Sequence, residues 1–215
     1  MAAQHLRSGL QAMDIRLDET QQQQLLTYLE LLRKWNRAYN LTAVREPLEM
    51  VSRHLLDSLA VLPRVAELAQ PGRPVLDVGT GPGLPGIPLA IALPEQPFVL
   101  LDSNGKKTRF LFQVQLAMKL DTIRIEQARI ETFRMETAPS LIISRAFASL
   151  QQFVEQTRPL WSRDPELRLL AMKGEYPADE LAALPAGWQV AAQTRLEVPQ
   201  LDAERHLIEL VQNGQ

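Results

Sequence analysis

The stretch VLDVGTGPGLPGIPLA, residues 75–90, constrains the fold of this chain more than any other part of the sequence. Its apolar start is typical of a buried strand that carries an acid, Asp77. Glycine tolerates positive φ angles and lets another group approach the backbone closely. The segment therefore predicts a strand, a bare loop and a helix, with a ligand against the loop. Its glycines are Gly79, Gly81, Gly83 and Gly86.

The chemistry of the ligand follows from the acids around the loop. Gly81, Gly83 and Gly86 fit the G-x-G-x-x-G spacing of dinucleotide-binding loops. Asp102 ends the next apolar run, FVLLD, where an acid binds ribose hydroxyls. Asp77 would repel a pyrophosphate and attract a cation. S-adenosylmethionine carries an ammonium and a sulfonium group and no phosphate, so the pattern favours it over a nicotinamide dinucleotide. The structural alternative is that Asp77 caps the helix after the loop.

Residues 1–70 predict a helical extension. Leu25, Leu29 and Leu32 recur at three- and four-residue spacing, which is typical of one apolar helix face. Further helices are expected up to about residue 68, broken near Pro63. The first residues, including His5, are expected to form a loose terminus.

Residues 71–215 predict one Rossmann-like unit that begins after the turn sequence QPGRP. Short apolar runs alternate with helical stretches, which is typical of a mostly parallel sheet with helices on both faces. The last two apolar runs have no helix between them. We therefore expect the fold to be α/β, closed by a C-terminal antiparallel hairpin.

Composition excludes several classes of site. The chain has 215 residues, a net charge of −2 and no cysteine, which excludes disulfides, thiolate metal sites and a cysteine nucleophile. No cluster has metal-ligand spacing, so we expect no metal. No apolar run is long enough to span a membrane, so a soluble cytoplasmic protein is expected. A stand-alone nucleic-acid binder is usually basic, so this chain would need a local basic patch to bind RNA.

The methyl acceptor is only partly constrained by the residues. Methylation at C5 of a pyrimidine needs a cysteine nucleophile, which this chain lacks. Methylation of an exocyclic adenine amine goes with an Asn/Asp-Pro-Pro-aromatic tetrad, and the run IISRAFASL has Arg145 at that place. The N7 lone pair of guanine is already nucleophilic and needs neither device. Other acceptors pass the same test, so the residues alone leave the acceptor open.

Six motifs in order give the chain a family resemblance. They are NLTAVREPLEMVSRHLLDS, DVGTGPGLPGIPLAI, LLDSNGKKTRFL, ISRAFASL, AMKG and LDAERHLIEL. Over about residues 17–211 the chain resembles the bacterial 16S rRNA guanine-N7 methyltransferases, the RsmG or glucose-inhibited division protein B family. The resemblance implies a class I S-adenosylmethionine-dependent methyltransferase fold with an N-terminal helical extension. It also implies methylation of the guanine at rRNA position 527, in the 530 loop of 16S rRNA, within the small ribosomal subunit or its precursor.

The resemblance and the residue patterns together nominate a set of site residues. Arg145 ends a buried strand, where a charge is costly unless it is paired, and Lys173 ends another; both are expected to position substrate. The expected cofactor contacts are Asp77, Gly79, Gly81, Leu84, Asp102, Ile130, Glu131 and Arg145. The expected RNA contacts are Arg129, Lys173, Arg205 and Arg53.

Two other functions remain open at this level. A nicotinamide-dependent oxidoreductase could use the same glycine loop, although Tyr28, Tyr39 and Tyr176 are poorly placed to serve a hydride site. A non-catalytic RNA-binding module could retain the loop without chemistry.

Overall fold

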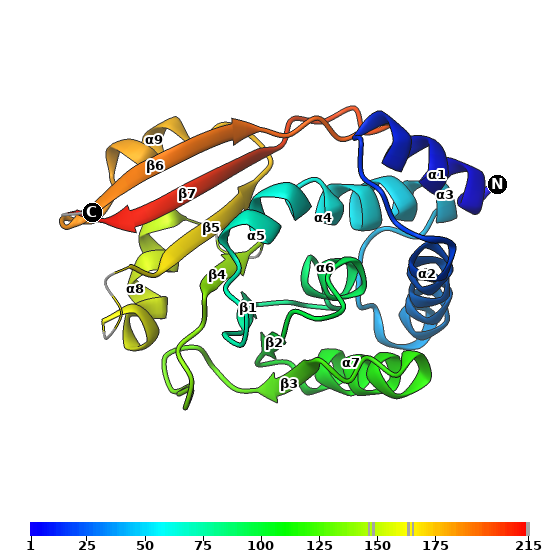
Figure 1. Cartoon of the computed structure of the whole chain (residues 1–215), viewed down its shortest axis with the longest axis horizontal. Helices are drawn as coiled ribbons and strands as arrows, with labels where there is room; N and C mark the ends of the chain where they lie inside the picture. The colour runs from blue at the N-terminus through cyan, green and yellow to red at the C-terminus, as the bar shows by residue number, and fades with distance from the viewer. Residues whose placement is uncertain (146, 148, 163, 165, 214–215) are drawn as a thin grey trace.

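A seven-stranded sheet forms the centre of the molecule, in a computed structural model that describes every residue except 146, 148, 163, 165, 214 and 215 (Figure 1). The strand order is β3-β2-β1-β4-β5-β7-β6. The first five strands in this order are parallel, and β7 is antiparallel to both β5 and β6. The mostly parallel sheet and the closing hairpin are thus confirmed. The strands are β1 Val75–Val78, β2 Phe98–Asp102, β3 Ile123–Gln127, β4 Leu141–Ser144, β5 Arg168–Lys173, β6 Trp188–Arg195 and β7 His206–Gln212.

Helices cover both faces of the sheet, because successive residues of each buried strand point to opposite sides. On β1, Val75 packs into one apolar cluster and Leu76 into the other. The first cluster includes α6 (Gly86–Ala92) and α7 (Gly105–Met118). The second includes α8 (Leu150–Trp161) and, through partly buried Leu181, α9 (Ala178–Ala182).

The N-terminal extension is helical, as expected. Its longest helix, α2 (Glu19–Tyr39), begins with a capping box between Asp18 and Gln21 and ends at Asn40 in the left-handed conformation. The other helices are α1 Ala2–Ala12, α3 Pro47–Met50, the π-helix η1 Val51–Leu56, α4 Asp57–Leu59 and α5 Leu62–Leu68.

The expectation of a loose terminus is wrong. Residues 2–12 form α1, whose Leu6 and Leu10 are buried one helical turn apart. His5 lies in this helix, and its Nε2 is 2.9 Å from the hydroxyl of Ser52. The short apolar stripe packs onto η1 and orders the segment.

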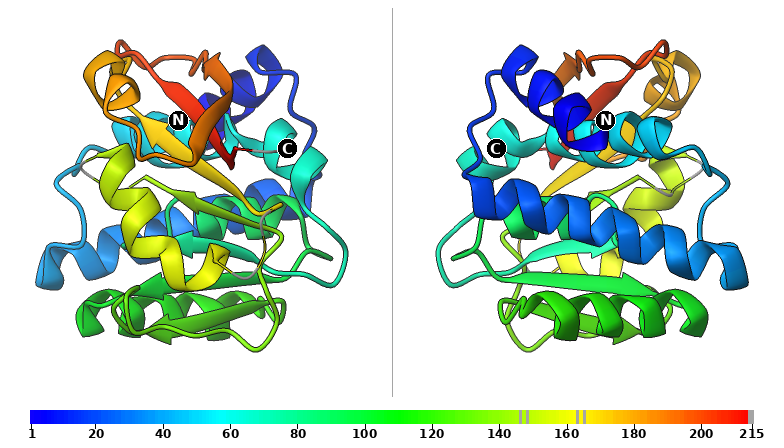
Figure 2. Two further views of the ribbon diagram at one scale, coloured as in Figure 1. Left: turned by 90° about the vertical axis from the view of Figure 1, so that its left-hand side faces the viewer. Right: turned by 90° about the vertical axis from the view of Figure 1, so that its right-hand side faces the viewer.

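The extension shares its core with the sheet. Helix α2 lies alongside α7 and against α6 (Figure 2), and its Tyr28 contacts Phe110 of α7 with ring centroids 6.2 Å apart. Buried Leu25 and Leu55 belong to the same apolar cluster as Phe110. The boundary near residue 70 is a change of sequence pattern, and the division into two domains stays a prediction.

Helix α2 also holds the glycine loop. The hydroxyl of Tyr28, which is fully buried, donates to the carbonyl of Pro82 in the loop at 2.9 Å. Gln21 Nε2 donates to the carbonyls of Ile91 and Ala92 at the end of α6, at 3.0 and 3.2 Å. The extension therefore fixes both the loop and the helix that follows it.

Asp77 holds the loop from beneath. Its Oδ2 accepts the hydroxyl of Thr80 at 2.6 Å and the backbone N–H of Gly86, the first residue of α6, at 2.8 Å. A Cβ at position 86 would lie 2.7 Å from that oxygen, so glycine is required for this approach. Gly79 and Gly81 adopt φ angles of 67° and 63°, which glycine tolerates. Asp77 therefore binds the first N–H of the helix after the loop, as the structural alternative in the sequence analysis expects.

Burial raises the pKa of Asp77 to about 6, although its hydrogen bonds from Thr80 and Gly86 favour the ionised form. The side chain is fully buried, and within the described part of the chain its Oδ1 accepts no hydrogen bond. Keeping this carboxylate ionised therefore costs folding free energy.

We expect Tyr28→Phe to lower the free energy of unfolding by about 1–3 kcal/mol, because the buried carbonyl of Pro82 loses its donor. Tyr39→Phe is the matched control on the same helix, since Tyr39 is 45% exposed, and its effect should stay within about 0.5 kcal/mol. Urea unfolding of the three proteins measures both. Equal losses in the two variants would contradict the role given to the Tyr28 hydroxyl.

Asp77 should also make stability depend on pH. Its folded-state pKa of about 6 lies above the ordinary value of 3.8, so the folded state binds the proton more tightly and stability falls as pH rises through this range. Asp77→Asn removes the ionisation. We expect the stability of the variant relative to the parent to rise by roughly 1–3 kcal/mol between about pH 4 and pH 7. Urea titrations at successive pH values test this, and a constant difference would refute it.

Candidate functional site

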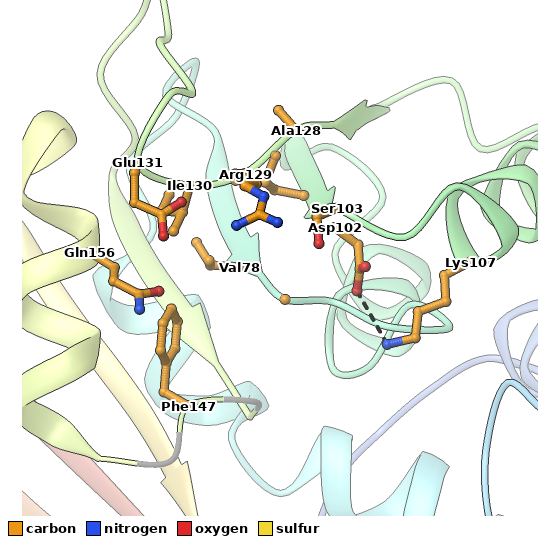
Figure 3. Close-up of a pocket in the computed structure, with 12 residues that line it drawn as sticks. Val78, Asp102, Ser103, Lys107, Ala128, Arg129, Ile130, Glu131, Phe147 and Gln156 are labelled. Atoms are coloured by element: carbon orange, nitrogen blue, oxygen red, sulfur yellow. Dashed lines mark ion pairs between the residues drawn. The ribbon is translucent and has the colours of Figure 1, made fainter.

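The first cavity lies where β1, β2 and β3 end and has a volume of about 430 Å³ (Figure 3). The carboxyl ends of parallel strands next to a topological switch point are where such sheets bind ligands. We call it the glycine-loop cavity. Its lining residues are Val78, Gly79, Leu101, Asp102, Ser103, Lys107, Ala128, Arg129, Ile130, Glu131, Phe147 and Gln156.

Asp102 is held rigidly at this cavity. Its Oδ2 accepts the N–H of Gly81 and its Oδ1 accepts the N–H of Asn104, both at 2.8 Å. The ammonium of Lys107 lies 3.6 Å from Oδ2, as the dashed line in Figure 3 marks. A carboxylate can accept about four hydrogen bonds, so Asp102 retains capacity for hydroxyl groups of a ligand. The geometry fits the acceptor that the sequence predicts here.

The loop after β3 supplies another wall of the cavity. Ile130 is buried and lines it, whereas Glu131 is exposed at its edge. The guanidinium of Arg129 points into the cavity from the same loop (Figure 3). Arg129, which was expected among the RNA contacts, lies beside the predicted cofactor residues, and its contact with RNA stays a prediction.

Several predicted cofactor residues do not line this cavity. The side chain of Asp77 lies beneath the loop, and Leu84 is buried in the apolar cluster on the α6 side. Gly81 contributes its N–H to Asp102 instead of lining the space. These three residues shape the loop. Among the expected contacts from this loop, Gly79 does line the cavity.

The second cavity has a volume of about 300 Å³. It brings together, from distant segments, four cationic residues that the sequence analysis nominated for the site. Arg53 comes from η1, Arg145 follows β4, Lys173 ends β5 and Arg205 precedes β7. We call it the arginine cavity. Its other lining residues are Val44, His54, Asp57, Met172, Gly174, Leu196 and His206.

Arg145 lies apart from most of the predicted cofactor residues. It was expected both to contact the cofactor and to position substrate, and among the two cavities it lines the arginine cavity. Its Nη1 donates to Asp57 Oδ2 at 2.8 Å and to the carbonyl of Arg53 at 3.0 Å. Its side chain thus forms an ion pair with a helix of the extension.

Asp57 is a residue of the candidate site that sequence reasoning missed. It is 1% exposed, and its two oxygens accept Arg145 and Arg205, the latter through Nε at 2.8 Å. The usable signal was an acid inside the apolar run HLLDSLAV, because a buried carboxylate needs a cationic partner. Glu209, which lies on β7 close to Arg205 in sequence, pairs with Arg64 and Arg168.

The two cavities meet at the loop after β4. Lys173 donates from Nζ to the carbonyl of Phe147 at 3.3 Å and pairs with Glu180 at 2.8 Å. Phe147 lines the glycine-loop cavity, and Lys173 lines the other. A ligand in each cavity would therefore lie on either side of this loop.

His54 adds no positive charge to the arginine cavity at neutral pH. Burial lowers its pKa to about 4, and the charge of Arg145 acts in the same direction. Its Nε2 lies 3.1 Å from the hydroxyl of Thr42. This agrees with a structural role.

The described residues contain no group of three or more histidines, cysteines or acids arranged to hold a metal ion. A separate search of the described helices finds none that is long and apolar enough to cross a bilayer.

Comparison with solved structures shows the fold. TrmN from Thermus thermophilus is 24% identical with a TM-score of 0.56, covering 75% of this chain and 53% of that protein. TrmK of M. capricolum, solved with S-adenosylhomocysteine, is 16% identical with a TM-score of 0.52, covering 71% and 67%. The class I methyltransferase fold is thus confirmed.

Sequence comparison identifies the family. The family model GidB, described as rRNA small subunit methyltransferase G, matches residues 21–208. The ribosomal RNA small subunit methyltransferase G of Ectopseudomonas mendocina is 56% identical over 206 residues, 96% of this chain and 94% of the relative. That of Hahella chejuensis is 52% identical over 211 residues, 98% and 94%. The chain therefore belongs to the family of ribosomal RNA small subunit methyltransferase G.

Proposed function

We propose that the protein transfers a methyl group from S-adenosylmethionine to N7 of a guanine in small-subunit ribosomal RNA. The observation that carries the proposal is the pair of cavities on either side of the loop after β4. One presents a fixed carboxylate, Asp102, and the other gathers four cationic side chains. Family membership supports the methyl donor and the RNA class, and the sequence resemblance implies the guanine at position 527 of 16S rRNA.

The glycine-loop cavity suits the donor. Asp102 would accept hydrogen bonds from ribose hydroxyls, and Ile130 offers an apolar surface for the adenine ring. Gly79 has no side chain, so its backbone can approach the ligand closely. The volume of about 430 Å³ lies in the range of small-molecule sites. Asp77 would act indirectly, because its Oδ2 holds the loop in shape from beneath. Its other oxygen, Oδ1, is buried and accepts no hydrogen bond from the described residues.

Catalysis by this chain would consist of positioning. When bound, S-adenosylmethionine supplies an electrophilic methyl group. Guanine N7 carries its own lone pair, so no side chain has to remove a proton before attack. The residues around both cavities hold the two reactants in line and exclude water, which can lower a barrier by several kcal/mol, about 7–11 in favourable cases. This accounts for a site in which the described residues offer no evident general base.

The alternative functions differ in what they require. A nicotinamide-dependent oxidoreductase is not supported, because the family is one of methyltransferases. A non-catalytic RNA-binding module would keep the arginine cavity and lose methyl transfer, which the measurements below decide.

We also propose that the substrate is a structured ribonucleoprotein, the small ribosomal subunit or its precursor, in the cytoplasm. The net charge of −2 is low for a protein that binds naked RNA. The arginine cavity supplies a local basic patch, but only a small one. Contacts with an assembled particle would add the remaining affinity.

Removing the ribose acceptor should weaken donor binding. We expect Asp102→Ala to raise the Kd for S-adenosylmethionine at least tenfold, since a hydrogen bond to a charged group contributes about 1.5–3 kcal/mol. Asp121→Ala removes an exposed carboxylate after α7 and serves as control. Calorimetric titration gives both affinities, and thermal melting shows whether the variants fold. An unchanged Kd in a folded Asp102→Ala variant would contradict the cofactor site.

Labelled methyl transfer tests the reaction and its substrate. We expect the purified protein to label small ribosomal subunits faster than bare 16S rRNA, with the label as 7-methylguanosine at one guanine. Mass spectrometry of the digested RNA locates it, and rRNA from cells that lack the gene should miss this one nucleoside. Equal rates on both substrates would contradict the ribonucleoprotein proposal. If neither substrate is labelled, the proposed methyl transfer itself is contradicted.

A further inference from the structure

The arginine cavity carries an excess of positive charge within a chain of net negative charge. Four of its lining side chains are cationic, and Asp57 is the one carboxylate among the described lining residues. Two of the cations have acidic partners of their own at the edge of the cavity, Arg53 with Glu49 and Lys173 with Glu180. Arg145 and Arg205 instead share the single carboxylate of Asp57. This pair therefore carries one positive charge more than its partner neutralises.

Asp57 holds both guanidinium groups at the wall of the cavity, one on each carboxylate oxygen. Its side chain is 2% exposed, while those of Arg145 and Arg205 are 26% and 18% exposed. Each arginine is thus held at one end by a buried acid and open to solvent at the other. Buried acids paired in this way are rigid, because leaving either partner alone is costly.

The π-helix η1 helps to create this arrangement. The N–H of Asp57 donates to the carbonyl of Ser52, five residues earlier, instead of to Arg53 as it would in an α-helix. The carbonyl of Arg53 accepts Nη1 of Arg145. A backbone group of the π-helix therefore orients the same guanidinium as the carboxylate does. Such π segments are frequent at functional sites.

The guanidinium of Arg145 retains a free fork. Its contacts with described residues use Nη1 alone, so Nε and Nη2 have no partner within the described part of the chain. Arg205 uses Nε and Nη1, the latter on the carbonyl of Glu204. Two parallel N–H donors of this kind match the oxygens of a phosphate.

A phosphate fits this fork better than the edge of the target guanine. An arginine fork on guanine binds O6 and N7 together. In the proposed reaction the N7 lone pair must attack, so a donor bonded to N7 would block it. The nearest acceptors of matching geometry in RNA are the phosphate oxygens.

We propose that Asp57 is a positioning residue that holds Arg145 and Arg205 so that the pair grips one backbone phosphate of the RNA, placing the guanine beside the methyl donor. This inference rests on the proposed function, and it adds the residue and the contact by which the RNA is held.

The test separates charge from geometry. Asp57→Asn keeps both arginine charges and removes their anchor. We expect its kcat at saturating RNA to fall at least tenfold, while the Kd for S-adenosylmethionine stays within twofold and the salt dependence of RNA binding stays unchanged. Arg145→Gln removes a charge, so the slope of log K against log salt should become shallower by about one. RNA binding is measured by filter retention without a methyl donor.

Matched variants complete the design. Arg124→Gln removes an exposed cation on β3, 53% exposed and paired with Glu126, and should change neither slope nor kcat. Arg145→Lys keeps the charge and loses the fork, so it should lose kcat like Asp57→Asn, and the double variant should lose little more than either. If Asp57→Asn fails to fold, Arg145→Lys decides the question alone.

The outcomes are distinct from those of the proposed function. A kcat within twofold of the parent for folded Asp57→Asn or for Arg145→Lys, or an unchanged slope for Arg145→Gln, overturns the inference. A parent protein that binds small-subunit RNA and transfers no methyl group overturns the proposed function, and leaves the slope measurement to judge the phosphate contact.

Discussion

The glycine loop is held between two carboxylates, and the rest of the site depends on this restraint. Asp77 binds Thr80 and the first N–H of α6 from beneath, and Asp102 binds the N–H of Gly81 from the side. A loop rich in glycine loses much conformational entropy when it becomes ordered. The two acids, with the hydroxyl of Tyr28 on Pro82, offset that loss at fixed points. The backbone that a ligand approaches is therefore rigid before the ligand arrives.

Buried acids also set the balance of charge at each of the two cavities. A buried carboxylate such as Asp77 is costly, and its raised pKa reflects that cost. Its position beneath the loop still places negative charge near the bare backbone, which disfavours phosphate ligands there. At the other cavity the balance is reversed, because Asp57 is outnumbered by its arginine partners. In the proposed function, the molecule thus separates a site for a cationic donor from a site for an anionic acceptor, within one chain of net charge −2.

Sequence reasoning could predict what local pattern determines. The strands at residues 75–78 and 98–102 and the closing hairpin follow from the pattern of apolar runs, and the structure confirms them. It failed where long-range packing decides. Helix α1 is ordered by contact with η1, and no propensity in residues 2–12 announces that partner. Arg145 was assigned by its place at a strand end, but its ion-pair partner, Asp57, lies 88 residues earlier and lines the arginine cavity with it. The sequence marks Asp57 only as an acid inside an apolar run, and neither its two arginine partners nor the π-helix can be read from local pattern.

The ion pair between Asp57 and Arg205 joins residues 148 positions apart in the chain. Asp57 lies on a helix of the extension and Arg205 directly precedes β7, so the pair forms only when the extension packs against the end of the sheet. Without that packing Asp57 lacks one of its two partners, and the apolar cluster that the extension shares with Leu207 of β7 is incomplete. Separation of the extension from β7 would therefore dismantle the arginine cavity together with the apolar core beside it.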